Sequence, residues 1–189
     1  MDPRATRTRE QLQQAVLALA NERPLDDITI GDIAERAAVN RSSFYQHYSD
    51  KEVLLADALE AIIDAAAAPL RRQLQQGGPP AMPPELIGYL EHIAAYAPLY
   101  RSVLGEHGSA AVAARLRRRI EQIVGETVTA TAATARDDVP VDVVSAGIAG
   151  STLGVITAWV MRDPLPKVET AAHWLESVLL TPARMLTEE

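Results

Sequence analysis

The stretch Thr29–Leu55, TIGDIAERAAVNRSSFYQHYSDKEVLL, decides the fold of this chain because it contains consecutive helix start signals. Thr29 is followed three residues later by Asp32, the spacing of a capping box in which each side chain binds a free backbone N–H. This pattern predicts a short helix over 30–37. Asn40 is a favoured N-cap residue, so it predicts a second short helix over 41–48. A tight turn at 38–39 would join the two.

Helical patterns continue on both sides of this stretch. Ser49, with Glu52 at the third helical position, predicts a further helix that reaches the mid-seventies. Before the stretch, apolar residues at three-and-four spacing predict a helix from about Thr6 or Thr8 to Asn21. After it, the glycine- and proline-rich segment 77–84 breaks the chain, and helices are expected at about 85–97, 110–134, 141–161 and 167–186. No strand is expected, so the predicted fold class is all-α.

Composition agrees with helices and excludes several classes of protein. Of the 189 residues, 48% are hydrophobic but only 4% are aromatic, which suits closely packed helices better than sheets. The absence of cysteine excludes disulfides, thiolate metal sites and a cysteine nucleophile. The first residues lack the apolar run of a signal peptide, and no uninterrupted apolar run approaches the roughly 18 residues of a membrane span. We therefore expect a cytoplasmic protein without a membrane segment.

Net charge permits a DNA-binding surface without predicting one. The value of −7 argues against nucleic acid only as an average over the chain. Basic residues still gather locally, at Arg4, Arg7 and Arg9 near the start and at Arg41, His47 and Lys51 later.

Three consecutive helices of this kind form the pattern of a helix-turn-helix, in which the second helix supports the third and the third enters the major groove. Phe44 and Tyr48 lie four residues apart, so both can pack against the neighbouring helices. Arginine can bind guanine through two hydrogen bonds and glutamine can bind adenine, while hydroxyls and Lys51 suit phosphate oxygens. A purely structural three-helix unit is the alternative. The candidate DNA-binding residues are Thr29, Arg41, Ser42, Ser43, Tyr45, Gln46, His47, Tyr48 and Lys51.

Residues 6–59 closely resemble the DNA-binding domain of the tetracycline-repressor (TetR) family of transcriptional regulators, and residues 29–55 carry the resemblance. Residue types and spacing agree over this whole length. Ala38 stands where many family members have glycine, so the turn is expected to differ slightly. The C-terminal half resembles the family in its pattern of helices. Its segments 98–105 and 154–159 look like those of regulators near the dihydroxyacetone-kinase-operon branch.

The resemblance implies a nine-helix, Ω-shaped homodimer, with a DNA-binding domain over 1–55 and an effector-binding and dimerisation domain over 56–189. It implies a regulator, expected to be a repressor, that binds a palindromic operator and is released by a small-molecule effector. The last two helices would form the dimer interface. Small residues at Gly147, Ser151, Gly154 and Ala158 make a stripe that a partner helix could approach closely, with intramolecular packing as the alternative. The last helix would add Ala171, Trp174, Leu175, Val178 and Leu179.

Large and polar-tipped side chains of the C-terminal half are the candidates for an effector pocket, because small-molecule sites combine apolar walls with a few polar groups. Ordinary core packing is the alternative for each of them. The candidate effector-binding residues are Tyr89, His92, Tyr96, Tyr100, Val103, Leu116, Ile120 and Trp159, with Ile93 as a further possible lining residue.

Two rival functions remain at the sequence level. One is a ligand-independent DNA binder or an activator with the same fold. The other is a helical enzyme that uses His92 or His107 with a carboxylate, although the chain lacks a nucleophile motif, a phosphate loop and metal-ligand spacing. The adjacent pairs Glu91-His92 and Glu106-His107 point in different directions on a helix. No catalytic residue, metal site or cofactor is therefore predicted.

Overall fold

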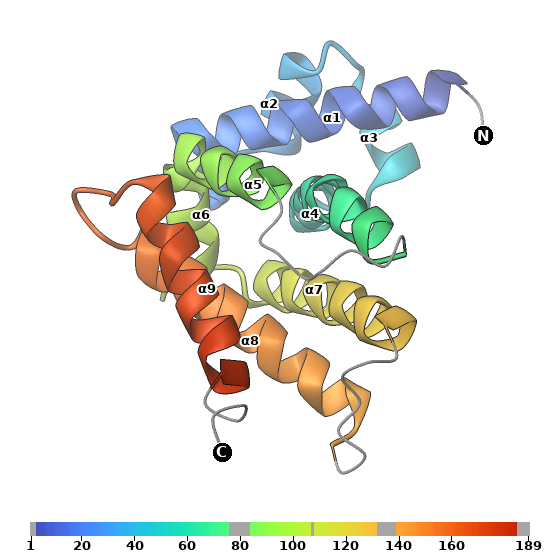
Figure 1. The fold of residues 1–189 in the computed structure, drawn as a ribbon. Coiled ribbons are helices and arrows are strands. Elements are labelled where there is room, and N and C mark those ends of the chain that lie inside the picture. Colours follow the sequence, from blue (N-terminus) through green and yellow to red (C-terminus); the bar gives the residue numbers. More distant parts are fainter. Residues whose placement is uncertain (1–2, 76–83, 107, 132–138, 185–189) are drawn as a thin grey trace. The chain divides into compact units, whose positions relative to one another are not determined.

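The computed structural model describes residues 3–75, 84–106, 108–131 and 139–184 (Figure 1). Over these ranges the chain forms nine α-helices and one 3₁₀ turn, and no strand occurs in them. The all-α, nine-helix prediction is confirmed to that extent. Residues 77–83 of the predicted break at 77–84 and His107 lie outside the described residues, while Pro84 begins the next helix.

The first compact unit comprises Met1–Ala61 and Tyr96–Arg115. It holds α1 (Pro3–Glu22), the 3₁₀ turn η1 (Leu25–Asp27), α2 (Ile30–Arg36), α3 (Arg41–His47) and α6 (Ala97–Leu104), with the first part of α4 (Lys51–Gln75) and of α7 (Ala110–Thr131). Helix α1 packs against α2, α3 and α6. Its apolar face is buried in the core of this unit, with Leu12 and Val16 both 0% exposed.

The second compact unit comprises Ile62–Ala95 and Leu116–Glu189. It holds α5 (Pro84–Ala95), α8 (Val141–Val160) and α9 (Val168–Arg184), together with the remaining parts of α4 and α7. Helix α9 packs against both α5 and α8. These two units are defined by how closely their residues pack, not by function. The functional division after residue 55 stays a prediction.

The start signals of the two short helices are confirmed in atomic detail. The Asp32 amide donates to Thr29 Oγ1 at 3.1 Å, and the Thr29 amide donates to Asp32 Oδ2 at 2.9 Å, which completes the capping box of α2. The hydrogen bond from the Thr29 amide lowers the pKa of Asp32. At α3, Asn40 Oδ1 accepts from the Ser43 amide at 2.7 Å.

The start of α4 differs from the prediction by one residue. Asp50 Oδ1 accepts from the Val53 amide at 2.8 Å, while the Ser49 hydroxyl donates to Asp50 Oδ2 at 2.9 Å. Asp50 is therefore the N-cap, and the predicted Ser49 cap is wrong. A carboxylate at this position also suits the positive end of the helix dipole.

The turn between α2 and α3 passes through Ala38 at φ 54°, in the left-handed region. The amides of Ala38 and Val39 donate to the carbonyls of Glu35 and Ala34, each at 3.0 Å. An alanine in this conformation costs about 1–2 kcal/mol through its Cβ, a cost that glycine would avoid. The backbone thus makes a glycine-type turn with a residue that is strained there.

Candidate nucleic-acid interface

Helix α3 has one exposed and one buried face. Arg41, Ser42, Tyr45 and Gln46 are exposed, and Tyr45 is 52% exposed. On the opposite side, Phe44 is 0% exposed and its ring meets that of Tyr45 edge-on at a centroid distance of 5.5 Å. The buried ring fixes the helix, while the four exposed side chains stay available to a partner.

Side chains at the two ends of α3 carry further polar groups. Ser42 Oγ and Ser43 Oγ donate to Asn40 Oδ1 at 2.6 and 2.9 Å, so one cap residue holds both hydroxyls at the start of the helix. His47 is half-buried at the other end. The Arg41 guanidinium lies over the Tyr45 ring at 6.0 Å, a cation–π distance that restrains both side chains.

Tyr48 is buried, whereas a residue that contacts DNA is expected to be exposed. It is 5% exposed, and its hydroxyl donates to Asp57 Oδ2 at 2.6 Å and accepts from Arg9 Nε at 3.1 Å. Asp57 also accepts from Arg9 Nη2 at 2.9 Å and from Gln13 Nε2 at 2.8 Å. We call these four residues the Asp57 cluster. It ties the end of α3 to α1 and α4.

The electrostatics of the Asp57 cluster follow from its burial and its hydrogen bonds. Burial, followed by the hydrogen bond to Asp57, raises the pKa of Tyr48 to about 12. For Asp57, burial raises the pKa, but the hydrogen bonds from Tyr48, Gln13 and Arg9 outweigh it and leave the pKa lowered. The cluster therefore contains a neutral phenol, a carboxylate and a guanidinium around neutral pH.

Lys51 and Thr29 are both engaged within the protein. The Lys51 ammonium donates to the carbonyls of Leu25, Asp26 and Ile28 at 2.7, 3.1 and 2.9 Å. It thereby holds the η1 turn against the start of α4. Thr29 is exposed, but its hydroxyl caps α2. As the side chains are arranged here, Tyr48 and Lys51 stabilise the helix-turn-helix from within.

Of the four arginines at positions 115–119 on α7, two form ion pairs and two are exposed to solvent. Arg115 pairs with Glu60 at 2.5 Å in the first unit, and Arg119 pairs with Asp64 in the second through Nε–Oδ1 at 2.8 Å. Arg117 and Arg118 are exposed.

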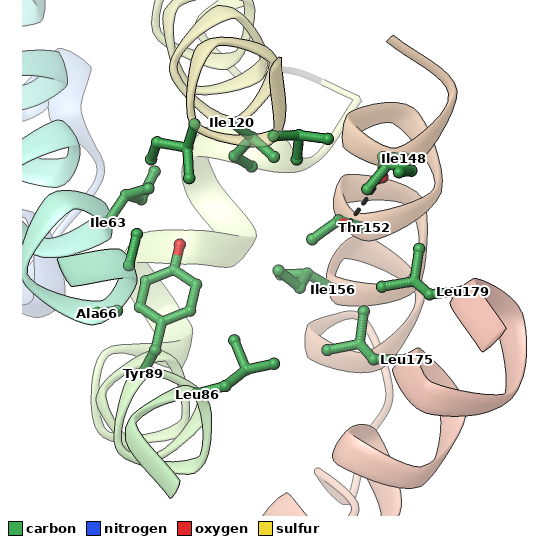
Figure 2. A pocket seen from close by; sticks show the side chains of 13 residues that line it. Ile63, Ala66, Leu86, Tyr89, Ile120, Ile148, Thr152, Ile156, Leu175 and Leu179 are labelled. Atoms are coloured by element: carbon green, nitrogen blue, oxygen red, sulfur yellow. Dashed lines mark hydrogen bonds between the residues drawn. The ribbon is translucent and has the colours of Figure 1, made fainter. Parts of the chain in front are cut away.

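A pocket of about 200 Å³ lies within the second unit (Figure 2). Figure 2 shows side chains from the surrounding helices converging on it, with the Tyr89 ring along one wall and Thr152 and Ile156 on the opposite one. The lining residues are Ile63, Ala66, Ala67, Leu86, Tyr89, Ile120, Ile123, Val124, Ile148, Thr152, Ile156, Leu175 and Leu179.

Of the predicted effector residues, Tyr89 and Ile120 line this pocket. Leu116, Ile93 and Trp159 are buried in the same unit without lining it, and Trp159 Nε1 donates to the Pro166 carbonyl at 2.9 Å. His92 is half-buried on α5, where burial lowers its pKa.

The other three predicted effector residues belong to the first unit. Tyr96 is half-buried, and Tyr100 is 2% exposed. Val103 borders a separate hollow of about 620 Å³ that includes Arg101 and Glu106. The predicted set is thus divided between two units, because α5 ends at Ala95 and α6 packs on α1.

Sequence reasoning missed most of the pocket because it looked for large, polar-tipped side chains. The walls are instead branched aliphatics at helical spacing, such as Ile148, Thr152 and Ile156 on α8. Their only signal is amphipathic periodicity, which core packing produces equally well.

Helix α8 carries an unusually open apolar surface. Its length and composition alone would allow it to cross a membrane, with a mean hydropathy of 1.7, and 28% of the tested window is buried. Val143 is 55% exposed, and Gly147, Gly154 and Ala158 are exposed on the same side. A Cβ built on either glycine would meet nothing within 4 Å.

On α9 only part of the predicted interface is open. Ala171 and Leu175 are each 1% exposed within the unit, and Leu179 lines the pocket. Trp174 lies 4.7 Å from the Arg162 guanidinium, and Val178 is 45% exposed.

In this chain a short helix and a tight turn lead into a second short helix, which is capped, held by its neighbours and exposed on one polar face. This arrangement defines a helix-turn-helix protein. Residues 14–58 match the family described as bacterial regulatory proteins, tetR family. Two curated relatives each match part of this chain. An uncharacterised HTH-type transcriptional regulator, YxbF of Bacillus subtilis, is 46% identical over 56 residues, which is 29% of this chain and 15% of the relative. The regulator EthR of Mycobacterium tuberculosis is 33% identical over 72 residues, 34% of this chain and 33% of the relative.

The whole chain shares its fold with a solved structure, that of the TetR-family repressor FadR of Thermus thermophilus in complex with lauroyl-CoA. The TM-score is 0.69 at 23% identity, and the match covers 96% of both chains. Residues 14–58 are thus similar to the TetR family of bacterial regulatory proteins, and the described fold is that of a solved TetR-family structure. The curated relatives are transcriptional regulators rather than enzymes, but the chain spans a third or less of their lengths.

Proposed function

We propose that this protein binds double-stranded operator DNA through the exposed face of α3. The observation that carries the proposal is the separation of that helix into a buried face and an exposed polar face. Arginine and glutamine, the residue types of Arg41 and Gln46, can each bind a base edge in the major groove through two hydrogen bonds, while the hydroxyls of Ser42 and Tyr45 suit phosphates. Ser43 and His47 are edge contacts. Tyr48 and Lys51 are left out, since Tyr48 is buried and three backbone carbonyls hold the Lys51 ammonium.

We further infer that the protein acts as a homodimer through α8 and α9. The exposed stripe of Val143, Gly147, Gly154 and Ala158 supports this, because small residues let two helices approach closely and an apolar helix face gains from being covered. A twofold dimer would present its two recognition helices to half-sites about 34–36 Å apart, so the operator would be palindromic.

The regulator is proposed to be a cytoplasmic repressor that a small-molecule effector releases from DNA. The pocket in the second unit supports an effector, and the FadR structure of the shared fold holds lauroyl-CoA. Such a ligand must bind the released state more tightly than the DNA-bound state, since equal affinity shifts nothing. Transcription in vitro from a promoter that holds the operator separates repression from activation.

The DNA proposal is tested by selecting duplexes from a random-sequence library at low salt and measuring affinity by fluorescence anisotropy. Arg41→Ala should weaken binding roughly 5- to 150-fold, as expected for a lost base contact of ~1–3 kcal/mol. Arg117→Ala removes another exposed charge, on α7, and should change the affinity less than twofold. The proposal fails if no duplex is retained, or if the two variants bind alike.

The dimer is tested by sedimentation equilibrium of Gly147→Leu. The leucine fits the isolated subunit, because nothing lies within 4 Å of the added Cβ, but it would collide with a partner helix. Gly88→Leu makes the same change at an equally open position on α5 and should leave the dimer intact. A monomeric wild-type protein, or an unaffected Gly147→Leu dimer, contradicts the α8 interface.

A further inference from the structure

The lining of the pocket in the second unit consists almost wholly of hydrocarbon. Of the thirteen described lining residues none is charged, and only Tyr89 and Thr152 carry a hydroxyl. The Thr152 hydroxyl already donates to the Ile148 carbonyl at 2.8 Å within its own helix. A ligand that fills this space therefore meets methyl and methylene groups from five helices and one aromatic ring.

Two charged residues beside the pocket lining pair with each other. Asp64 follows Ile63 and Arg119 precedes Ile120, and Arg119 Nε donates to Asp64 Oδ1 at 2.8 Å. Neither is available to pair with an ionised group on a ligand. Moving an unpaired carboxylate or ammonium into such a site is strongly unfavourable, whereas an uncharged chain loses nothing there.

The volume limits the size of the ligand. A dry apolar cavity of ~150 Å³ holds a benzene molecule. The pocket here measures about 200 Å³. By proportion it holds roughly eight carbon atoms in compact packing. A long chain or a bulky head group would have to remain outside the described lining.

We propose that this pocket takes a small, uncharged aliphatic molecule of roughly eight carbons as the effector. The inference rests on the proposed regulatory function and adds the chemical class of its ligand. Because each buried methylene contributes a similar transfer free energy, affinity should rise about fourfold per added methylene until the pocket is full.

Isothermal titration of the full-length protein without DNA tests this directly. The probes are straight-chain 1-alkanols from butanol to dodecanol, with octanoate and octylammonium as charged matches of 1-octanol. We expect affinity to rise up to about eight carbons and then level off, and both charged probes to bind at least 100-fold more weakly than 1-octanol. Octanoate binding as tightly as 1-octanol would overturn the proposal, as would an affinity that keeps rising up to dodecanol.

Three variants connect the binding to this pocket. Ala66→Leu fills it and should shorten the chain length at which affinity levels off, while Ile156→Ala enlarges it and should lengthen that limit (Figure 2). Ala65→Leu adds the same side chain at an exposed position on the same helix and should change nothing. If Ala66→Leu does not fold, the chain-length limit of Ile156→Ala still tests whether the alkanols bind in this pocket. An unchanged limit in the folded variants refutes the pocket.

The two proposals fail separately. Titration reports on the pocket whether or not the protein binds any duplex, so a loss of DNA binding alone would remove the regulatory function. If the protein binds DNA, 1-octanol should weaken that binding for wild type more than for Ala66→Leu. Saturation by 1-octanol without any change in DNA affinity would overturn its class as the effector.

Discussion

Tyr48→Phe deletes one hydroxyl at the end of α3 and leaves the buried ring in place. The lost hydrogen bond to Asp57 is 2.6 Å long and its acceptor is charged. Hydrogen bonds to charged groups contribute about 1.5–3 kcal/mol. Asp57 keeps its bonds from Arg9 and Gln13, so the lower end of that range applies and we expect a loss of about 1.5 kcal/mol. For a chain of this length, that lowers Tm by about 3–6 °C.

Thermal and urea denaturation followed by circular dichroism at 222 nm measure this loss. Tyr45→Phe is the matched control, since it removes the same hydroxyl from an exposed residue of the same helix. It should change stability by less than ~0.5 kcal/mol. For DNA affinity we expect the opposite order of the two variants. Tyr45→Phe should weaken operator binding about fivefold through a lost phosphate contact of ~1 kcal/mol, while folded Tyr48→Phe keeps most of its affinity.

A double-mutant cycle with Asp57→Asn isolates the Tyr48–Asp57 pair, because it subtracts what each change does separately. A coupling of about 1 kcal/mol is expected. If Tyr48→Phe is as stable as wild type, or if Tyr45→Phe loses as much stability, the Asp57 cluster does not hold α3 as described.

Three further expectations can be checked by urea denaturation. Gly108→Ala should cost about 1–3 kcal/mol, because its Cβ would meet the Val103 carbonyl oxygen at 2.1 Å; Gly88→Ala, with open space around it, should instead stabilise by about 0.5–1 kcal/mol. Ala38→Gly should stabilise by about 0.5–1 kcal/mol, the relief at φ 54° less the entropy that glycine loses on folding, and equal or lower stability would contradict strain at this turn. His92 has a lowered pKa in the folded state, so its contribution is present above its ordinary pKa of 6.5 and is lost as pH falls below it; His92→Gln should flatten that part of the pH profile.

The features that could be predicted from the sequence are those that depend on residues close together in the chain. The capping box of Thr29 and Asp32 and the Asn40 cap depend on residues three apart, and both formed as predicted. Ser49 was wrongly predicted as the N-cap of α4 because Ser49 and Asp50 are adjacent and both residue types can cap a helix. In the structure the Asp50 carboxylate accepts the hydrogen bond from the Val53 amide.

Long-range partners were beyond the sequence. In the Asp57 cluster, Arg9 and Gln13 bind residues that lie 39 to 48 positions later, so nothing in the pattern around Tyr48 distinguishes a buried hydroxyl from a phosphate contact. Lys51 is a similar case, since its carbonyl partners lie 23 to 26 residues earlier in a turn that periodicity did not predict. The pocket combines separate segments of chain, and its aliphatic walls resemble any other core positions.

The occupied amine of Lys51 has a practical consequence. The chain has two lysines, and the other, Lys167, is exposed after α8. Because three carbonyls hold the Lys51 ammonium, amine-reactive labels and sensor-chip coupling should react there slowly and favour Lys167 among the side chains. Conventional carbodiimide immobilisation through lysine would then attach the molecule by a residue of the second unit and leave the side chains of α3, which contains no lysine, chemically unmodified.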